Sequence, residues 1–261
     1  MELRFITLVF LCTFKLTFSQ ENYNYKFTYN FDFKPLRNDS ARISENMVLL
    51  SGKKTSMFIS PIKIILDSVK KAHLKKRLSP YNFLEFKKKY PKNSVTYTIQ
   101  KRDDKIIYQN KVATKVIEYD QNNPNFNWKI QDKTLNMLGY RCQLATTQYM
   151  GRNYEAWFSN EIPIQDGPYK FSGLPGLIFK IYDTEKQFIF TLKSIKKENN
   201  TFPELKKGRR VVKTTHKNFS KVAENIFLSF ANRLDQASRR KMMTQIKDGK
   251  KNANQIELIV N

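Results

Sequence analysis

Cysteine, histidine and glycine are scarce in this chain of 261 residues, which has two, two and eight of them respectively. A disulfide framework needs more cysteines, and two distant histidines provide little for a zinc cluster or a histidine-based catalytic dyad. The eight glycines and nine prolines are also too few for a collagen-like or low-complexity chain. We therefore expect a folded protein with no metal and no cofactor, and the composition gives little support to an enzyme.

Acidic residues are also in the minority, because 23 Asp and Glu face 47 Lys and Arg, for a net charge of +24. The excess lies in two flanking segments: residues 63–92 have ten basic and two acidic residues, and residues 202–261 have fourteen and five. Such flanks attract anionic lipid, acidic polysaccharide or nucleic acid, and solubility alone is the simpler explanation. No nucleic-acid-binding motif accompanies the charge, so we expect no nucleic-acid partner.

Long apolar runs are missing too, apart from one near the start. Residues 5–14 are apolar, follow Arg4, and precede Thr17-Phe18-Ser19, which offers small residues at the −3 and −1 positions of a signal-peptidase site. We predict that residues 1–19 are a signal peptide and that residues 20–261 form one domain. The run is too short to span a bilayer, so we expect no transmembrane span after cleavage. The protein would then be exported to the periplasm, the cell envelope or the medium, with a possible envelope or outer-membrane partner.

Alternating apolar residues dominate what remains. Residues 23–33 place six aromatic side chains on one face of a strand, and a glycine-containing loop at 51–54 predicts a hairpin. Spacings of three and four residues predict amphipathic helices over about 62–77 and 219–235. We therefore expect a mainly β (α+β) fold, a curved antiparallel sheet or partial barrel with one or two amphipathic helices packed on it. Further strands are predicted at 95–99, 106–108, 112–119, 126–130, 140–148, 154–159, 177–182 and 187–194.

One cysteine would remain after export, because cleavage removes Cys12. Cys142 alternates with Tyr140 and Leu144, which indicates that it points to the apolar face of a strand. Reactive cysteines need solvent access and a positive neighbour, so we predict a buried, inert thiol.

Half of the glycines lie between residues 150 and 180. Leu174-Pro175-Gly176-Leu177 has proline and glycine at the central positions of a type II turn, in which Gly176 would need a positive φ. Gly173 permits a second unusual backbone angle just before it. We therefore interpret Gly173, Pro175 and Gly176 as a structural turn that precedes a buried strand, with contact to a ligand as the alternative.

The hexapeptide from Gly173 to Ile178 reads GLPGLI, and the chain resembles the GLPGLI family of exported Bacteroidetes proteins. The resemblance is most specific over residues 138–182, where GRNYEAWF at 151–158 and GPYKF at 167–171 follow the family's order and spacing. It implies an exported cell-envelope protein of unknown function, and it implies no catalytic residue or cofactor.

Candidate ligand-binding residues surround these loops: Arg152, Trp157, Tyr169 and Lys170 form a cationic and aromatic set that suits a sugar or peptide with an anionic group. The alternative is that Trp157 or its neighbours pack within the sheet and that Arg152 lies in a hairpin turn. We assign no catalytic residue, although Glu155, Glu161, Asp166 and Asp183 are the acids at hand.

Taken together, these features predict a non-catalytic binding or scaffold protein of the envelope, with an apolar, peptide or lipid ligand. Two alternatives stay open: a surface interaction protein that uses its basic flanks on acidic glycan or lipid, and an envelope hydrolase.

Overall fold

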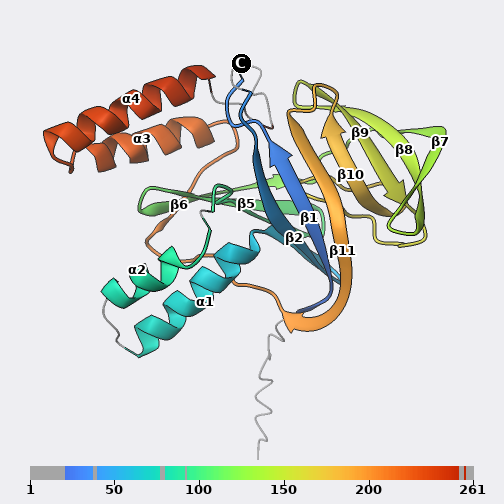
Figure 1. Cartoon of the computed structure of the whole chain (residues 1–261), viewed down its shortest axis with the longest axis horizontal. Helices are drawn as coiled ribbons and strands as arrows, with labels where there is room; N and C mark the ends of the chain where they lie inside the picture. The colour runs from blue at the N-terminus through green and yellow to red at the C-terminus, as the bar shows by residue number, and fades with distance from the viewer. Residues whose placement is uncertain (1–20, 38–39, 77–79, 92, 253–255, 257–261) are drawn as a thin grey trace, which may run out of the picture.

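The strands and helices follow the order that alternating and helical spacing predict. A computed structural model describes residues 21–37, 40–76, 80–91, 93–252 and 256, so the predicted signal peptide lies outside the described residues. Within these ranges the chain forms twelve strands and four helices (Figure 1). The strands are β1 (Asn22–Phe33), β2 (Ile43–Gly52), β3 (Thr55–Ile59), β4 (Thr98–Arg102), β5 (Lys105–Val112), β6 (Lys115–Asn122), β7 (Lys129–Met137), β8 (Tyr140–Tyr149), β9 (Arg152–Ser159), β10 (Leu177–Asp183), β11 (Phe188–Thr201) and β12 (Val211–Lys213), and the helices are α1 (Pro61–Lys75), α2 (Pro80–Lys88), α3 (Phe219–Ala231) and α4 (Gln236–Asn252).

All twelve described strands belong to one sheet, in the order β12-β6-β5-β4-β3-β2-β1-β11-β10-β9-β8-β7. Neighbouring strands are antiparallel, except that the short β12 runs parallel to β6. The sheet is open, because β12 and β7 end it without pairing to each other. The predicted mainly β fold with an antiparallel sheet is confirmed.

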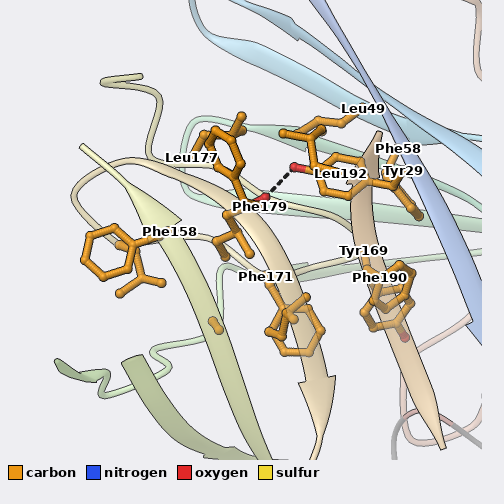
Figure 2. Close-up of a cluster of buried hydrophobic side chains, with 14 of the residues drawn as sticks. Tyr29, Leu49, Phe58, Phe158, Tyr169, Phe171, Leu177, Phe179, Phe190 and Leu192 are labelled. Atoms are coloured by element: carbon orange, nitrogen blue, oxygen red, sulfur yellow. Dashed lines mark hydrogen bonds between the residues drawn. The ribbon is translucent and has the colours of Figure 1, made fainter. Parts of the chain in front are cut away.

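Both halves of the sheet face one main core. Its buried side chains come from β1 to β6 on one side and from β8 to β11 on the other. Figure 2 shows part of this core, where Tyr29 of β1 lies near Phe58 and Leu192, and its hydroxyl donates to the carbonyl oxygen of Ile178 at 2.6 Å. Because strands from opposite halves share these contacts, the sheet must curve around the core.

The aromatic stripe of β1 does not stay on one face, which corrects the sequence prediction. Phe27, Tyr29 and Phe31 belong to the main core, whereas Tyr23 lies in a second cluster with Leu50 and Phe202. The register shifts between Tyr23 and Tyr25 against both neighbouring strands. A bulge of this kind turns the following side chains to the other face, and strict alternation cannot anticipate it.

Two predicted strands also have different bounds. The predicted strand 112–119 is interrupted by a turn after Val112, where Ala113 has a φ of +50°, and β6 begins only at Lys115. The predicted strand 126–130 is mostly an irregular segment, because Asn127 has a φ of +45° and β7 begins at Lys129. In both segments the apolar residues keep alternating through a turn. The strand is interrupted there because one residue has a positive φ.

Helices α1 and α3 lie where helical spacing predicted them, and they contact β2 and β5/β6, respectively. Ser60 caps α1, since its hydroxyl accepts from the Lys63 backbone N–H at 3.5 Å. The second helix of each pair, α2 on α1 and α4 on α3, was not predicted. Among the described residues, no helix has the length and apolar character needed to cross a membrane.

Candidate functional site

The connection between β9 and β10, residues 160–176, folds back into the main core. Tyr169, Phe171 and Leu174 are at most 3% exposed, so this segment packs like an element of the interior. Phe171 contacts the rings of Phe126 and Tyr154, at centroid distances of 5.3 and 4.8 Å. The motif-bearing loop is thus fixed by apolar contacts on several strands.

A buried ion pair holds the same loop on β4. The Lys101 ammonium donates to Asp166 Oδ1 at 2.5 Å and to the carbonyl oxygens of Gly167 and Phe171 at 2.9 Å each. Burial lowers the pKa of Lys101, and the charge of Asp166 opposes that change. Because three acceptors surround its three N–H groups, Lys101 holds the loop against β4.

Lys170 is completely buried among aromatic rings. Its ammonium donates to the Tyr119 hydroxyl and to Gln121 Oε1, both at 3.0 Å. It also lies 5.2 to 5.6 Å from the ring centroids of Tyr108, Tyr119 and Tyr169. These contacts attach the loop to β5 and β6 through cation–π and hydrogen-bond interactions.

Arg152 lies at the start of β9, away from the tyrosine rings that surround Lys170. Its guanidinium contacts Asp183 Oδ2 and Gln187 Oε1 at 3.1 Å each, and stacks 4.9 Å from the ring centroid of Phe188. Asp183 also accepts from the Phe188 backbone N–H at 2.7 Å. Arg152 therefore ties β9 to the turn between β10 and β11.

Trp157 occupies a third place, in the middle of β9. It is 5% exposed, and the Lys133 ammonium of β7 lies 6.0 Å from its ring centroid. Of the four candidate ligand-binding residues, the structure brings together only Tyr169 and Lys170. All four lie in the interior of the protein, and their role in ligand binding stays a prediction.

One of the two glycines of the hexapeptide has the predicted backbone angle and the other does not. Gly173 has a φ of +86°, as its interpretation required. Gly176 is not among the residues with positive φ; instead, a Cβ at this position would lie 2.0 Å from the carbonyl oxygen of Ser159. Its backbone N–H donates to the Leu174 carbonyl at 2.7 Å, which makes a tighter turn around Pro175 than the predicted type II turn. Gly176 is needed for close approach to the end of β9.

A groove runs over the surface beside this loop and has two joined parts. The first, of about 450 Å³, lies between the β2–β3 hairpin loop and residues 163–166, and includes Lys53, Lys54 and Thr55. Glu21 braces that hairpin: its carboxylate accepts from the Lys54 N–H at 2.8 Å and from the Thr55 hydroxyl at 2.5 Å. Burial would raise the pKa of Glu21, but these hydrogen bonds outweigh it and lower the pKa.

The second part, of about 480 Å³, is formed by residues 123–130 and the 172–175 turn. Asn123 and Gln165 line both parts, so the two parts adjoin at these residues. Trp128 is half-buried there and donates from Nε1 to the Ser172 carbonyl at 2.9 Å. The side chains that line this part are amides, apolar groups, one hydroxyl and one indole: Asn123, Pro124, Asn125, Phe126, Asn127, Trp128, Ile130, Gln165, Ser172, Leu174 and Pro175.

Apart from Gly173 and Pro175, for which contact to a ligand was the alternative to a structural turn, none of these groove residues was predicted as a site residue. Residues 123–125 lay between the predicted strands 112–119 and 126–130, and Trp128 belonged to the second of these. The available signal was an asparagine-rich segment next to a tryptophan, which is the composition of a polar recognition loop.

The four acidic residues that were considered for catalysis do not meet at one site. Glu155 accepts from the Tyr182 hydroxyl at 2.5 Å, Glu161 accepts from the Arg141 backbone N–H at 2.7 Å, and Asp166 and Asp183 hold the contacts given above. Within the described part of the chain, no three His, Cys, Asp or Glu side chains are grouped so that they could hold a metal ion. The first part of the groove includes the charged side chains of Lys53, Lys54 and Asp103, and the second part is lined mainly by amides and apolar groups.

Comparison with known proteins gives one short family match. A family model described as "Protein of unknown function (Porph_ging)" matches residues 150–180, which contain β9, the core-bound loop and the start of β10. No curated protein matches the chain.

Solved structures show likeness in fold. PNGF-II, in structures of its P21 and C2 space groups, matches with a TM-score of 0.50 and 13% identity, over 77% of this chain and 33% of the PNGF-II chain. This chain thus spans about a third of the PNGF-II chain, and at such identity the likeness shows the fold alone. An uncharacterized conserved protein from Thermus thermophilus matches with a TM-score of 0.39 and 6% identity, over 74% of this chain and 91% of that one.

Proposed function

We propose that this chain is a non-catalytic binding protein of the cell envelope and that its groove holds an extended peptide. The observation that carries the proposal is that the amide-lined groove opens onto an exposed edge strand, β7, through Trp128 and Ile130. The ligand class follows from the chemistry of the two features together.

The groove supplies partners for both parts of a peptide. Asn123, Asn125 and Gln165 offer side-chain donors and acceptors that suit a peptide main chain. Trp128 and Ile130 offer apolar surface for a side chain, and Ile130 is 49% exposed. A few polar groups that fix orientation beside apolar surface are typical of ligand sites.

The edge strand favours a peptide over a sugar. Eight of the nine residues of β7 are exposed, and among the described strands β7 pairs only with β8. An exposed edge binds extended chains by adding a strand, because its free N–H and C=O groups match those of a peptide. The irregular register between Ile130 and Thr134, together with Lys129 and Lys133, opposes pairing with a second copy of the same edge.

Membership of the GLPGLI family and export are part of the same proposal. The hexapeptide at 173–178 lies inside the segment that the family of unknown function matches. The apolar run at 5–14 and the small residues at 17 and 19 support export. An intact mass that begins at Gln20 is expected for protein from the envelope fraction, and a mass that retains Met1 would contradict export by cleavage.

Native mass spectrometry of protein purified from its own envelope fraction tests the peptide. We expect a non-covalent adduct that fragments into amino-acid residues. Ile130→Lys should lose the adduct, whereas Leu138→Lys should keep it, because Leu138 is equally exposed, at 52%, but lies on the turn after β7. Both variants should keep the wild-type thermal midpoint. A phospholipid adduct, no adduct, or equal retention by both variants would overturn the proposal.

A further inference from the structure

Helices α1 and α2 form a pair that is fixed to the body mainly at one end. In the first half of α1, Ile64 packs on the second apolar cluster, and the Asp67 carboxylate lies 3.0 Å from the Lys206 ammonium. No residue of α1 is buried. Figure 1 shows the two helices side by side, extending away from the strands. The far end of this helical hairpin is therefore a surface feature of its own.

The hairpin has its own small core and leaves other apolar residues outside it. The His73 ring lies 5.9 and 6.4 Å from the ring centroids of Phe83 and Phe86, so these three fill the space between the helices. Leu74 and Tyr81 are 71% and 67% exposed, and Leu84 is 55% exposed. These exposures exceed that of any other large apolar side chain in the described part of the chain. Such residues on a monomer mark a contact surface when they occur together.

Lysines flank the exposed apolar residues. Lys70 and Lys71 lie four and three positions before Leu74, on the same side of α1, and Lys88 lies four positions after Leu84, on the same side of α2. Two of these lysines also have an acidic neighbour, because the Lys88 ammonium lies 2.6 Å from Glu85 and the Lys71 ammonium lies 3.9 Å from Glu204. Exposed pairs of this kind are weak, so the lysines can exchange these partners for anionic headgroups.

We infer that this face, formed by Lys70, Lys71, Leu74, Tyr81, Leu84 and Lys88, docks on the surface of an anionic phospholipid bilayer. Leucine and tyrosine at an interface enter the boundary between headgroups and acyl chains, while lysines contact anionic headgroups. An acidic polysaccharide would contact the lysines but would not bury the exposed leucines. The combination of lysines and leucines therefore favours a lipid surface. The face is separate from the groove, so the inference does not depend on the peptide ligand.

Flotation of the purified protein with lipid vesicles tests the docking face. We expect binding to vesicles of phosphatidylcholine with phosphatidylglycerol, and little binding to phosphatidylcholine alone. Lys70→Gln/Lys88→Gln should lower the partition coefficient about tenfold or more, as expected for lysines at an anionic surface. Leu74→Ser/Leu84→Ser should lower it by a similar factor, about tenfold, through lost apolar burial.

A matched pair controls for net charge. Lys217→Gln/Lys221→Gln removes two exposed lysines near the start of α3, and should bind the mixed vesicles within about twofold of wild type, because distant charges are screened. All three variants should keep the wild-type thermal midpoint and the adduct at the groove. Equal loss in the control pair, an unchanged partition in the leucine pair, or equal binding to neutral vesicles would each overturn the inference. Loss of the groove adduct alone would instead contradict the proposed peptide function.

Discussion

Two glycines of the hexapeptide, Gly173 and Gly176, are required for different physical reasons. Gly173 has a positive φ and open space around it, since the nearest atom to a Cβ there would be Trp128 Nε1 at 4.0 Å. Gly176 has no positive φ, but a Cβ would meet Ser159 backbone atoms at 2.0 and 2.5 Å. The Ser159 backbone belongs to β9, so it cannot move aside to make room for a Cβ as the end of a flexible side chain can.

Alanine substitutions should separate strain from crowding. We expect Gly173→Ala to cost about 1 kcal/mol of unfolding free energy, as for other positive-φ positions. Gly139→Ala, also at positive φ with no atom within 4 Å, should cost about the same. Gly176→Ala should cost about 3 kcal/mol or more, because β9 must move. Urea unfolding measures all three, and equal costs would contradict the crowding at Gly176.

Cys142 should be unreactive in the folded protein. Its side chain is buried, and burial raises the pKa of the thiol to about 11, with the Glu161 charge acting in the same direction. Because the thiolate is the reactive form, we expect iodoacetamide at pH 8 to label Cys142 only after urea unfolding. Peptide mapping reports the labelled site, and rapid labelling of the native protein would show that the thiol is accessible.

At the scale of elements, the loop between β9 and β10 depends on the Lys101–Asp166 pair. Removing one member leaves the other charge buried without its partner, so Lys101→Met should lower the unfolding free energy by about 3–5 kcal/mol. The double variant Lys101→Met/Asp166→Asn should lose less than the two single losses added together. Urea unfolding of the three variants measures this coupling, and strictly additive losses would mean that the pair does not fasten the loop.

Local patterns predicted the elements that bury one regular stripe. The β2–β3 and β10–β11 hairpins and the helix α1 follow from alternation, a turn sequence or spacings of three and four. The sequence did not predict the bulge between Tyr23 and Tyr25 or the turn at Ala113, because both depend on pairing with other strands. Helix α2 was not predicted because it has no fully buried stripe: Phe83 and Phe86 are only half-buried, and Tyr81 and Leu84 are exposed.

The candidate site was harder to predict than the fold. Arg152 and Trp157 lie near the hexapeptide in sequence, and chemistry alone suggested that they bind a ligand. The structure places both in the interior, where their role in ligand binding stays a prediction, and it assembles the groove from segments at 51–56, 123–130 and 163–175. Only the order of strands in the sheet brings these segments together, and spacing along the chain does not report that order.

At the scale of the whole molecule, the net charge of +24 should weaken the folded state by self-repulsion. Ions shorten the range of that repulsion to about 10 Å at 0.1 M salt. We therefore expect sodium chloride to raise the thermal midpoint by a few degrees between low and physiological ionic strength. Sucrose at matched osmolality serves as the uncharged control, and a midpoint that falls with salt would mean that attractive ion pairs outweigh the repulsion.

The central place of β1 has a consequence for how the chain folds. β1 is the first described strand, yet one of its two neighbours is β11, and the hydrogen-bonded side chains of Asn22 and Asn199 are 177 positions apart. Closing so long a loop is slow, because its entropy is lost before the contacts form. A chain emerging from its N-terminus therefore cannot pair both edges of β1 until about three-quarters of its length, through residue 201, is available. Until then one edge of β1 has no strand to pair with. We therefore expect the chain to fold late and to stay unfolded while it is being synthesised.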